Sequence, residues 1–100
     1  MGAPDVIDVD PRVLRVPPSR LSGADPGKLQ RQIFAYGMST DGIPPVFVFE
    51  CSDGELMLYD GVTRATRIAK LAPGVTIPAQ IIGKFRSPGG RWPTIGDVLP

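Results

Sequence analysis

The sequence predicts a small α+β domain with a mixed β-sheet and two main helices. Apolar patterns follow the order strand, helix, hairpin, helix, strand, which is typical of a sheet with helices packed on it. The chain contains 12 prolines and 12 glycines, and this favours many turns and short elements over long helices. Its 100 residues are enough for one modest core, so we expect one domain over 1–100.

Short alternating runs at 6–9 and 13–16 predict one or two strands at the start of the chain, separated by a turn at Asp10-Pro11. The pair Pro17-Pro18 ends the second run, because proline has no amide proton for a sheet hydrogen bond.

The first helix is predicted from Pro26 to about Tyr36. Asp25 is a favourable N-cap, Pro26 suits the first helical position, and Gly37 is a typical stop. Apolar residues recur at helical spacing within it, at Leu29, Ile33, Phe34 and Tyr36.

Aromatic and β-branched residues over 43–50 predict a strand, and the turn at 52–54 makes it the first half of a hairpin. We assign four aromatic residues to the core, namely Tyr36, Phe47, Phe49 and Tyr59. Three acidic residues that bracket the turn are expected to face solvent, namely Glu50, Asp53 and Glu55.

A last strand is predicted over 76–82, where Pro78 favours an edge strand or a first position. Periodicity fails after Gly83. The core is therefore expected over about 5–83, followed by an irregular tail over 84–100.

Residues 56–71 form the stretch with the clearest chemical purpose. An alternating run breaks at Asp60-Gly61 and becomes an amphipathic helix. Asp60 is predicted as its N-cap. We expect an aliphatic stripe to pack inward, formed by Val62, Ala65, Ile68, Ala69 and Leu71, and a basic stripe to face outward, formed by Arg64, Arg67 and Lys70.

The start of this helix suits an anion. The first amides, those of Val62, Thr63 and Arg64, have no partner within the helix, and the helix dipole is positive there. Thr63 adds a hydroxyl, and Arg64 can close a guanidinium fork over a phosphate. The alternative is a strand-to-helix junction with a structural cap and no ligand.

Composition excludes several classes of function. The formal net charge of +1 provides no global basic field for DNA binding. The absence of histidine removes Ser-His and Cys-His catalysis and the commonest zinc ligation. The single cysteine cannot form an internal disulfide, so a reducing compartment is expected, and no apolar run reaches the roughly 18 residues of a membrane span.

Three segments taken together resemble the ParB/sulfiredoxin superfamily. They are Ile43-Pro44-Pro45-Val46-Phe47-Val48, then Tyr59-Asp60-Gly61-Val62-Thr63-Arg64, and Ile77-Pro78-Ala79-Gln80-Ile81-Ile82. In that superfamily the strand-to-helix loop binds nucleotide phosphates, ATP in sulfiredoxins and CTP in chromosome-partition proteins, and some relatives are nucleases. The resemblance implies phosphate contacts at Gly61, Thr63 and Arg64.

The departures from the family narrow the function. Sulfiredoxins place a catalytic cysteine and a histidine directly after the glycine, where this chain has Val62 and Thr63. Sulfinic acid reduction is therefore excluded, since no thiolate stands at that position. The further arginines, helix-turn-helix domain and dimerisation region of the partition proteins are not found in this chain, so chromosome partition is not expected.

A narrower likeness is to ParB-like domains at the C-termini of secreted bacterial polymorphic toxins. It is carried by Asp60 to Arg67, by Ala69 to Leu71, and by Pro93 to Asp97. The resemblance implies the payload of a longer delivered protein, or a stand-alone relative of one, that acts in the bacterial cytoplasm with an immunity protein or another protein as partner. The short apolar runs predict no membrane partner.

Three hypotheses remain open. In the first, the chain hydrolyses phosphate esters as a nuclease or nucleotide hydrolase, with Arg64 and Asp60 catalytic, Arg67 completing the charge on the phosphate, and Asp60 holding Mg²⁺ against a nucleotide. In the second, the same pocket binds nucleotide without turnover and controls a protein partner. In the third, the basic stripe contacts DNA together with the tail cations Lys84, Arg86 and Arg91.

Overall fold

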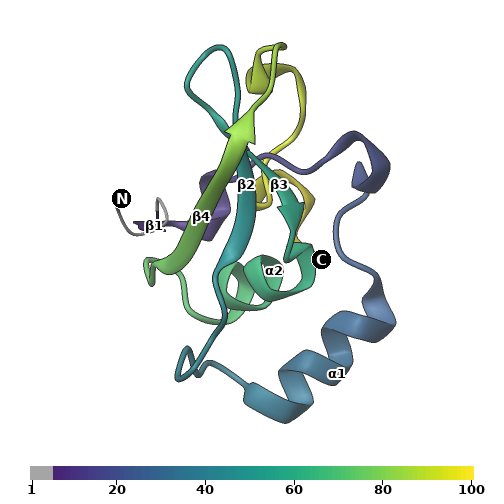
Figure 1. The fold of residues 1–100 in the computed structure, drawn as a ribbon. Coiled ribbons are helices and arrows are strands. Elements are labelled where there is room, and N and C mark those ends of the chain that lie inside the picture. Colours follow the sequence, from purple (N-terminus) through teal and green to yellow (C-terminus); the bar gives the residue numbers. More distant parts are fainter. Residues whose placement is uncertain (1–5) are drawn as a thin grey trace.

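The structure, a computed structural model, describes residues 6–100, so position 5 of the predicted core lies outside the described residues. Its centre is a four-stranded mixed sheet in the order β1-β4-β2-β3 (Figure 1). The strands are β1 (Val6–Val9), β2 (Val46–Glu50), β3 (Leu56–Asp60) and β4 (Ile77–Lys84). β4 runs parallel to β2, whereas β1 pairs with β4 and β3 pairs with β2 in antiparallel fashion. The predicted α+β class is confirmed.

Two helices accompany the sheet, α1 (Pro26–Tyr36) and α2 (Val62–Leu71). As predicted, the Asp25 carboxylate caps α1 by accepting a hydrogen bond from the Lys28 amide at 2.9 Å, and Gly37 ends the helix with a positive φ of 56°. The residues that the sequence placed at the two ends of this helix are therefore confirmed.

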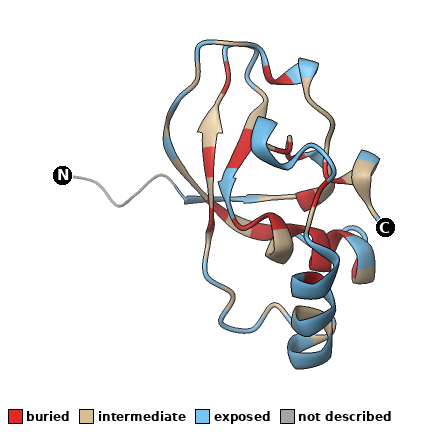
Figure 2. Cartoon of the chain, turned by 90° about the vertical axis from the view of Figure 1, so that its right-hand side faces the viewer, coloured by how far each residue is buried: buried red, intermediate tan, exposed pale blue. Residues whose placement is uncertain are grey.

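The core lies between α2 and one face of the sheet. α2 contributes Val62, Ala65, Ile68 and Ala69, and the strands contribute Val46, Val48, Leu58, Ile77 and Ala79. Figure 2 shows this buried layer in red, while most of α1 is pale blue because Leu29 is its buried residue. α1 therefore packs on α2 as a peripheral element.

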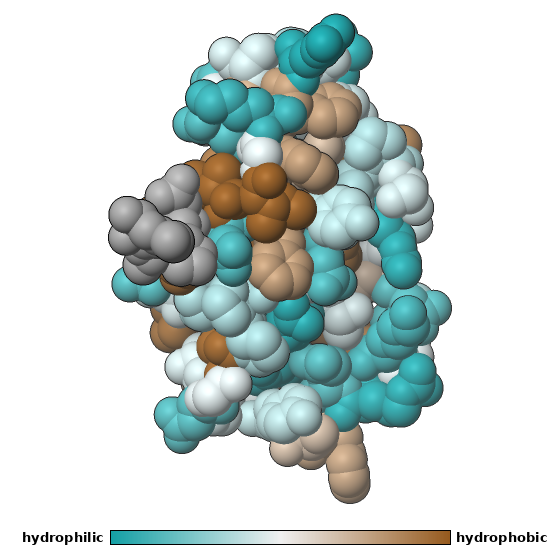
Figure 3. All heavy atoms as spheres, viewed as in Figure 1, coloured by the Kyte–Doolittle hydropathy of each residue, from teal (hydrophilic) through white to brown (hydrophobic). Residues whose placement is uncertain are grey.

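Two of the aromatic residues that the sequence assigned to the core lie at the surface. Tyr36 is 59% exposed and Tyr59 is 65% exposed, so this prediction is wrong for both. Phe47 and Phe49 are half-buried, because alternate residues of β2 face away from α2. Figure 3 shows apolar side chains gathered over β4 on a face of the molecule that solvent reaches.

The second predicted strand, 13–16, is absent as a regular strand from the described structure. A 3₁₀ turn, Pro11–Val13, occupies its start, because proline fixes φ and the Asp10 carboxylate accepts the Arg12 amide at 3.0 Å. Arg15 alone then bridges β3 at Met57 and the tail at Thr94.

β4 is an interior strand, so the suggestion from Pro78 of an edge strand or first position is wrong. Pro78 is the second residue of β4 and pairs with Asp8 of β1. The parallel pairing with β2 begins one residue later, at Ala79 and Val46, so the missing amide proton of the proline falls outside that ladder.

The tail is fastened to the rest of the domain. Ile95 is fully buried in the core, between 3₁₀ turns at Gly89–Arg91 and Gly96–Val98. The exposed Asp53 carboxylate accepts the amides of Gly89 and Gly90 at 3.0 and 2.9 Å, and these hydrogen bonds lower the pKa of Asp53. Glu55 is less exposed than expected, because Arg15 donates to its carboxylate at 2.9 Å.

No helix within residues 6–100 combines the length and the apolar character that a membrane crossing needs.

Candidate phosphate-binding site

Gly61 sets the geometry of the candidate site by turning the chain from β3 into α2. Its φ is +106°, in the left-handed region that favours glycine. A Cβ at this position would lie 2.5 Å from Cγ1 of Val46 in β2, so a larger residue does not fit without movement. The start of α2 is therefore held directly beside β2.

The prediction that Asp60 caps α2 is wrong. Asp60 is the last residue of β3, paired with Phe47, and the N-cap position belongs to Gly61, which makes no side-chain cap. The reason is the sharp turn at Gly61, since the chain leaves the strand and enters the helix within one residue. The carboxylate of Asp60 is left for other contacts.

Three amides at the start of α2 precede the first hydrogen bond of the helix, in which the Ala65 amide donates to the Gly61 carbonyl at 2.9 Å. They belong to Val62, Thr63 and Arg64, and no side chain within residues 6–100 caps them. The Val62 side chain is part of the core, so this residue offers its amide alone. Free amides at a helix start favour an anion.

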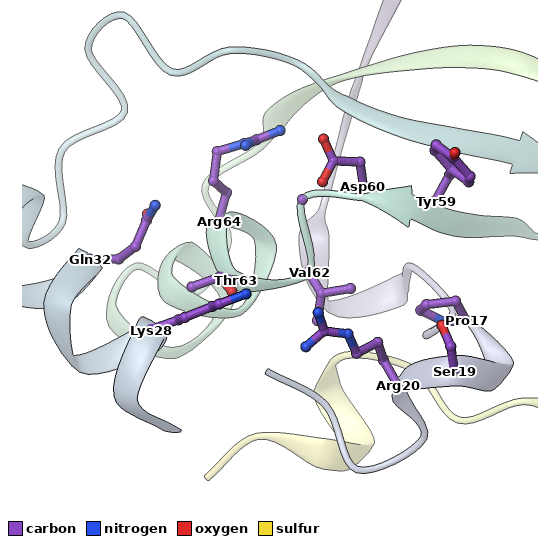
Figure 4. Close-up of a pocket in the computed structure, with 11 residues that line it drawn as sticks. Pro17, Ser19, Arg20, Lys28, Gln32, Tyr59, Asp60, Val62, Thr63 and Arg64 are labelled. Atoms are coloured by element: carbon purple, nitrogen blue, oxygen red, sulfur yellow. The ribbon is translucent and has the colours of Figure 1, made fainter. Parts of the chain in front are cut away.

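A pocket of about 620 Å³ surrounds this helix start. Figure 4 shows Asp60 and Arg64 on one side, Arg20 on the opposite side, and Lys28 of α1 reaching in beside Thr63. Gln32, one turn later on α1, also lines the pocket. Pro17, Ser19 and Tyr59 line the remaining end. The structure thus brings five predicted residues, Asp60, Gly61, Val62, Thr63 and Arg64, to one cavity.

The charge of the pocket is mainly positive. Three cations line it, namely Arg20, Lys28 and Arg64, against one carboxylate, that of Asp60. The ion pairs within residues 6–100 are Arg15 with Glu55 and Lys84 with Glu50, so the three pocket cations are not neutralised by any described carboxylate. Their charges remain available to an anionic ligand.

Arg64 is only weakly engaged. Its Nη2 donates to the Pro45 carbonyl at 3.2 Å, a long hydrogen bond, and its Nε is buried with no hydrogen-bond partner among the described residues. A buried donor without a partner carries a desolvation cost, which a ligand oxygen would remove.

Arg67 does not line this pocket, although the sequence placed it on the outward basic stripe. It is 3% exposed, so the expectation that it faces outward is wrong. Its Nη1 donates to the carbonyls of Gly37 and Ser39, both at 2.8 Å, its Nε donates to Gln32 at 3.3 Å, and its guanidinium lies 5.3 Å from the Tyr36 ring centre. Burial lowers the pKa of Arg67. α1 covers the turn of α2 from which it extends, so Arg67 binds the end of α1.

The pocket offers a metal ion one carboxylate ligand, that of Asp60. Within residues 6–100 no three histidine, cysteine, aspartate or glutamate side chains form a group that could hold a metal. Asp60 alone matches the way Mg²⁺ is commonly bound, through one or two carboxylates together with the phosphates of the ligand. The residues fit a metal that arrives with a nucleotide.

Cys51 lies outside the pocket. It is buried at the end of the β2–β3 hairpin, and burial, with Asp53 and Glu55 nearby, raises the pKa of its thiol. This environment suits a structural thiol better than a nucleophile.

Sequence reasoning missed Arg20 and Lys28. Lys28 and Gln32 are four residues apart on α1 and so share one face of the helix. This spacing would have identified both as pocket residues only if the contact between α1 and α2 had been known. Arg20 ends a 3₁₀ turn, Pro18–Arg20, for which the sequence carries no periodic signal.

Comparison with known proteins adds no relative to this picture. No protein-family model matches the chain. No curated protein matches it either. The resemblance to the ParB/sulfiredoxin superfamily therefore rests on the sequence segments named above.

Proposed function

We propose that this chain is a ParB-like domain that binds a phosphate-bearing ligand, a nucleotide or nucleic acid, at the start of α2. The observation that carries the proposal is the convergence of three uncapped amides with Arg20, Lys28 and Arg64, none of which has an ion pair within residues 6–100. Amides and cations around one cavity are the donors that phosphate oxygens accept.

Each residue has a distinct role in the proposed phosphate binding. Gly61 lets the ligand approach the backbone, the amides at 62–64 and the Thr63 hydroxyl contact oxygens, and Arg64 supplies the charge-assisted fork. Arg67 supports the site indirectly, by holding α1 and with it Lys28 in place.

An amide-resolved NMR titration with inorganic phosphate, ATP, CTP, NAD and a short DNA duplex, each with and without Mg²⁺, tests the proposal. We expect saturable shifts centred on residues 61–64. Arg64→Ala should abolish them, whereas Arg91→Ala, which removes a cation outside the pocket, should not. A folded sample that shows no shifts at these amides with any ligand would contradict the proposal.

Hydrolysis of the bound phosphate ester is a second candidate function, favoured by the Asp60 carboxylate. It lines the pocket beside the phosphate-binding donors, and it makes no hydrogen bond within residues 6–100. A carboxylate next to a phosphate is repelled unless a cation lies between them, so turnover should require Mg²⁺ or a similar hard ion. Full activity of Asp60→Asn would remove this role.

The proposal includes that the chain acts as a toxin delivered into bacterial cells. Expression of the chain in bacterial cells should then arrest growth, and Arg64→Ala should relieve the arrest at equal protein level. If binding occurs without turnover or toxicity, the pocket serves a nucleotide-dependent contact with a protein partner.

Direct DNA contact through the basic stripe and tail has less support. Arg67 is buried against α1, and Lys84 pairs with Glu50 at 3.2 Å. Binding of a duplex that falls steeply as salt rises would favour this function over that of a small-nucleotide site.

A further inference from the structure

Arg64 stands between two cavities. Besides the phosphate pocket, it lines a smaller cavity of about 180 Å³, enclosed by the second half of α1, by α2, and by the connection 37–45 that leads from α1 to β2. Arg67 lines this second cavity as well. The two arginines lie on successive turns of α2 and hold opposite ends of the same connection.

Their holds on the connection differ in strength. Arg67 donates to the carbonyls of Gly37 and Ser39 at 2.8 Å each, with further contacts to α1. Arg64 makes one longer bond, 3.2 Å, to the Pro45 carbonyl, and its buried Nε has no partner among residues 6–100. The Gly37 end of the connection is therefore held by short side-chain hydrogen bonds, while the Pro45 carbonyl has one long side-chain hydrogen bond. The chain is fixed only one residue later, where the buried Val46 pairs with Ala79 of β4.

A phosphate in the pocket would compete for this contact. Two parallel N–H groups of a guanidinium can bind two oxygens of a phosphate, and charge-assisted bonds of this kind are about twice as strong as neutral ones. Turning toward the ligand would pair Nε and Nη2 together, whereas in the present position one bonds a carbonyl and the other has no partner.

We propose that Arg64 is a latch that holds the Pro45 carbonyl before a phosphate binds and releases it when one does, which loosens the connection 37–45. The proposal rests on the phosphate site proposed above. It adds that phosphate binding in the pocket changes the mobility of the connection 37–45, on the other side of Arg64, while Arg67 keeps α1 in position.

A three-dimensional HNCO experiment reads both events at once, with inorganic phosphate and then ATP as the probes. The amides of 62–64 report binding, and the carbonyl carbon of Pro45, detected through the Val46 amide, reports the latch. With ligand, the Pro45 carbonyl signal should move toward its position in ligand-free Arg64→Ala. The carbonyl signals of Gly37 and Ser39 should stay in place, since Arg67 still binds them.

The outcomes separate the two proposals. Shifts at 62–64 with an unmoved Pro45 carbonyl would overturn the latch and leave the phosphate site intact. An absence of both shifts would contradict the phosphate site and the latch together.

A matched pair of glycine variants tests the release without altering Arg64. Gly42, inside the connection, and Gly54, in the distant hairpin, have φ values of +66° and +84°, and a Cβ at either would meet nothing within 4 Å. Alanine therefore adds backbone strain without a clash at both positions.

If the connection loosens on binding, the strain in Gly42→Ala is partly relieved in the bound state, and linkage requires that phosphate then binds more tightly. We expect a gain of about three- to tenfold. Gly54→Ala should bind as the parent chain does. Equal affinities in the two variants would overturn the release of the connection.

Discussion

Replacing Arg67 by methionine tests whether this buried guanidinium is a structural anchor. The change keeps most of the aliphatic volume and removes the bonds to Gly37 and Ser39, both at 2.8 Å. Hydrogen bonds from a charged donor contribute about 1.5–3 kcal/mol each. Because the variant no longer buries a charge, part of this loss is offset, and we expect a net cost of about 2–4 kcal/mol.

A loss of this size is large for a domain whose unfolding free energy is on the order of 5–15 kcal/mol. Urea denaturation followed by circular dichroism measures it, and the melting temperature should fall by at least about 8 °C. Arg64→Met, one turn earlier on α2, is the matched control. It removes one 3.2 Å bond from a partly exposed side chain and should cost about 1 kcal/mol or less.

The same two variants also distinguish the roles of the arginines in binding. Below the denaturation midpoint, Arg67→Met should weaken phosphate binding only through the displacement of Lys28, while Arg64→Met should abolish it. A stability loss for Arg67→Met no greater than that for Arg64→Met would refute the anchor. A loss of binding in a fully folded Arg67→Met as complete as that in Arg64→Met would restore the direct phosphate contact that the sequence predicts for this residue.

Three further predictions concern Gly61, Asp53 and Asp60. Gly61→Ala adds left-handed backbone strain and places a Cβ 2.5 Å from Val46, so it should destabilise the fold by about 2–5 kcal/mol in urea denaturation. Gly54→Ala adds the strain without a clash and should cost about 1–2 kcal/mol. Similar losses in the two variants would argue against the close packing at Gly61. Because the pKa of Asp53 is lowered in the folded protein, its carboxylate stabilises the fold above the unfolded-state pKa, near 4, and this effect is lost as pH falls through the folded-state pKa. The difference in urea midpoint between the parent chain and Asp53→Asn should therefore become smaller toward acid pH. A difference that grows there would contradict the hydrogen-bonding role. Asp60→Asn should change stability by no more than about 0.5 kcal/mol, because Asp60 caps no helix, and should tighten phosphate binding measured calorimetrically without Mg²⁺; unchanged affinity would place the carboxylate away from the ligand.

The elements with strong local signals were predictable from sequence. Asp25, Pro26 and Gly37 define the ends of α1 by their own chemistry, and the change of period at Gly61 locates the start of α2. The helix start with its free amides could be predicted for the same reason, since it depends on chain geometry over a few residues.

Features that depend on packing between distant segments could not be predicted. Arg64 and Arg67 look equivalent on a helical stripe, and only the position of α1 makes one of them a pocket residue and the other a buried anchor. Lys28 and Arg20 join the site from elements whose placement no periodicity reveals. Tyr59 alternates like a core residue, yet it lies on the face of the sheet away from α2.

The segment around Arg15 sets a practical limit on how the chain can be shortened. Its backbone bonds Leu56 and Leu58 of β3 on one side, while Val16 bonds Pro93 on the other. A protein truncated after β4 would lose the tail residues, including Pro93, that hold this segment against the sheet. The edge of β3 would then be exposed and could pair with the edge of another molecule. Fusion partners should therefore follow Pro100 and leave residues 85–99 in place.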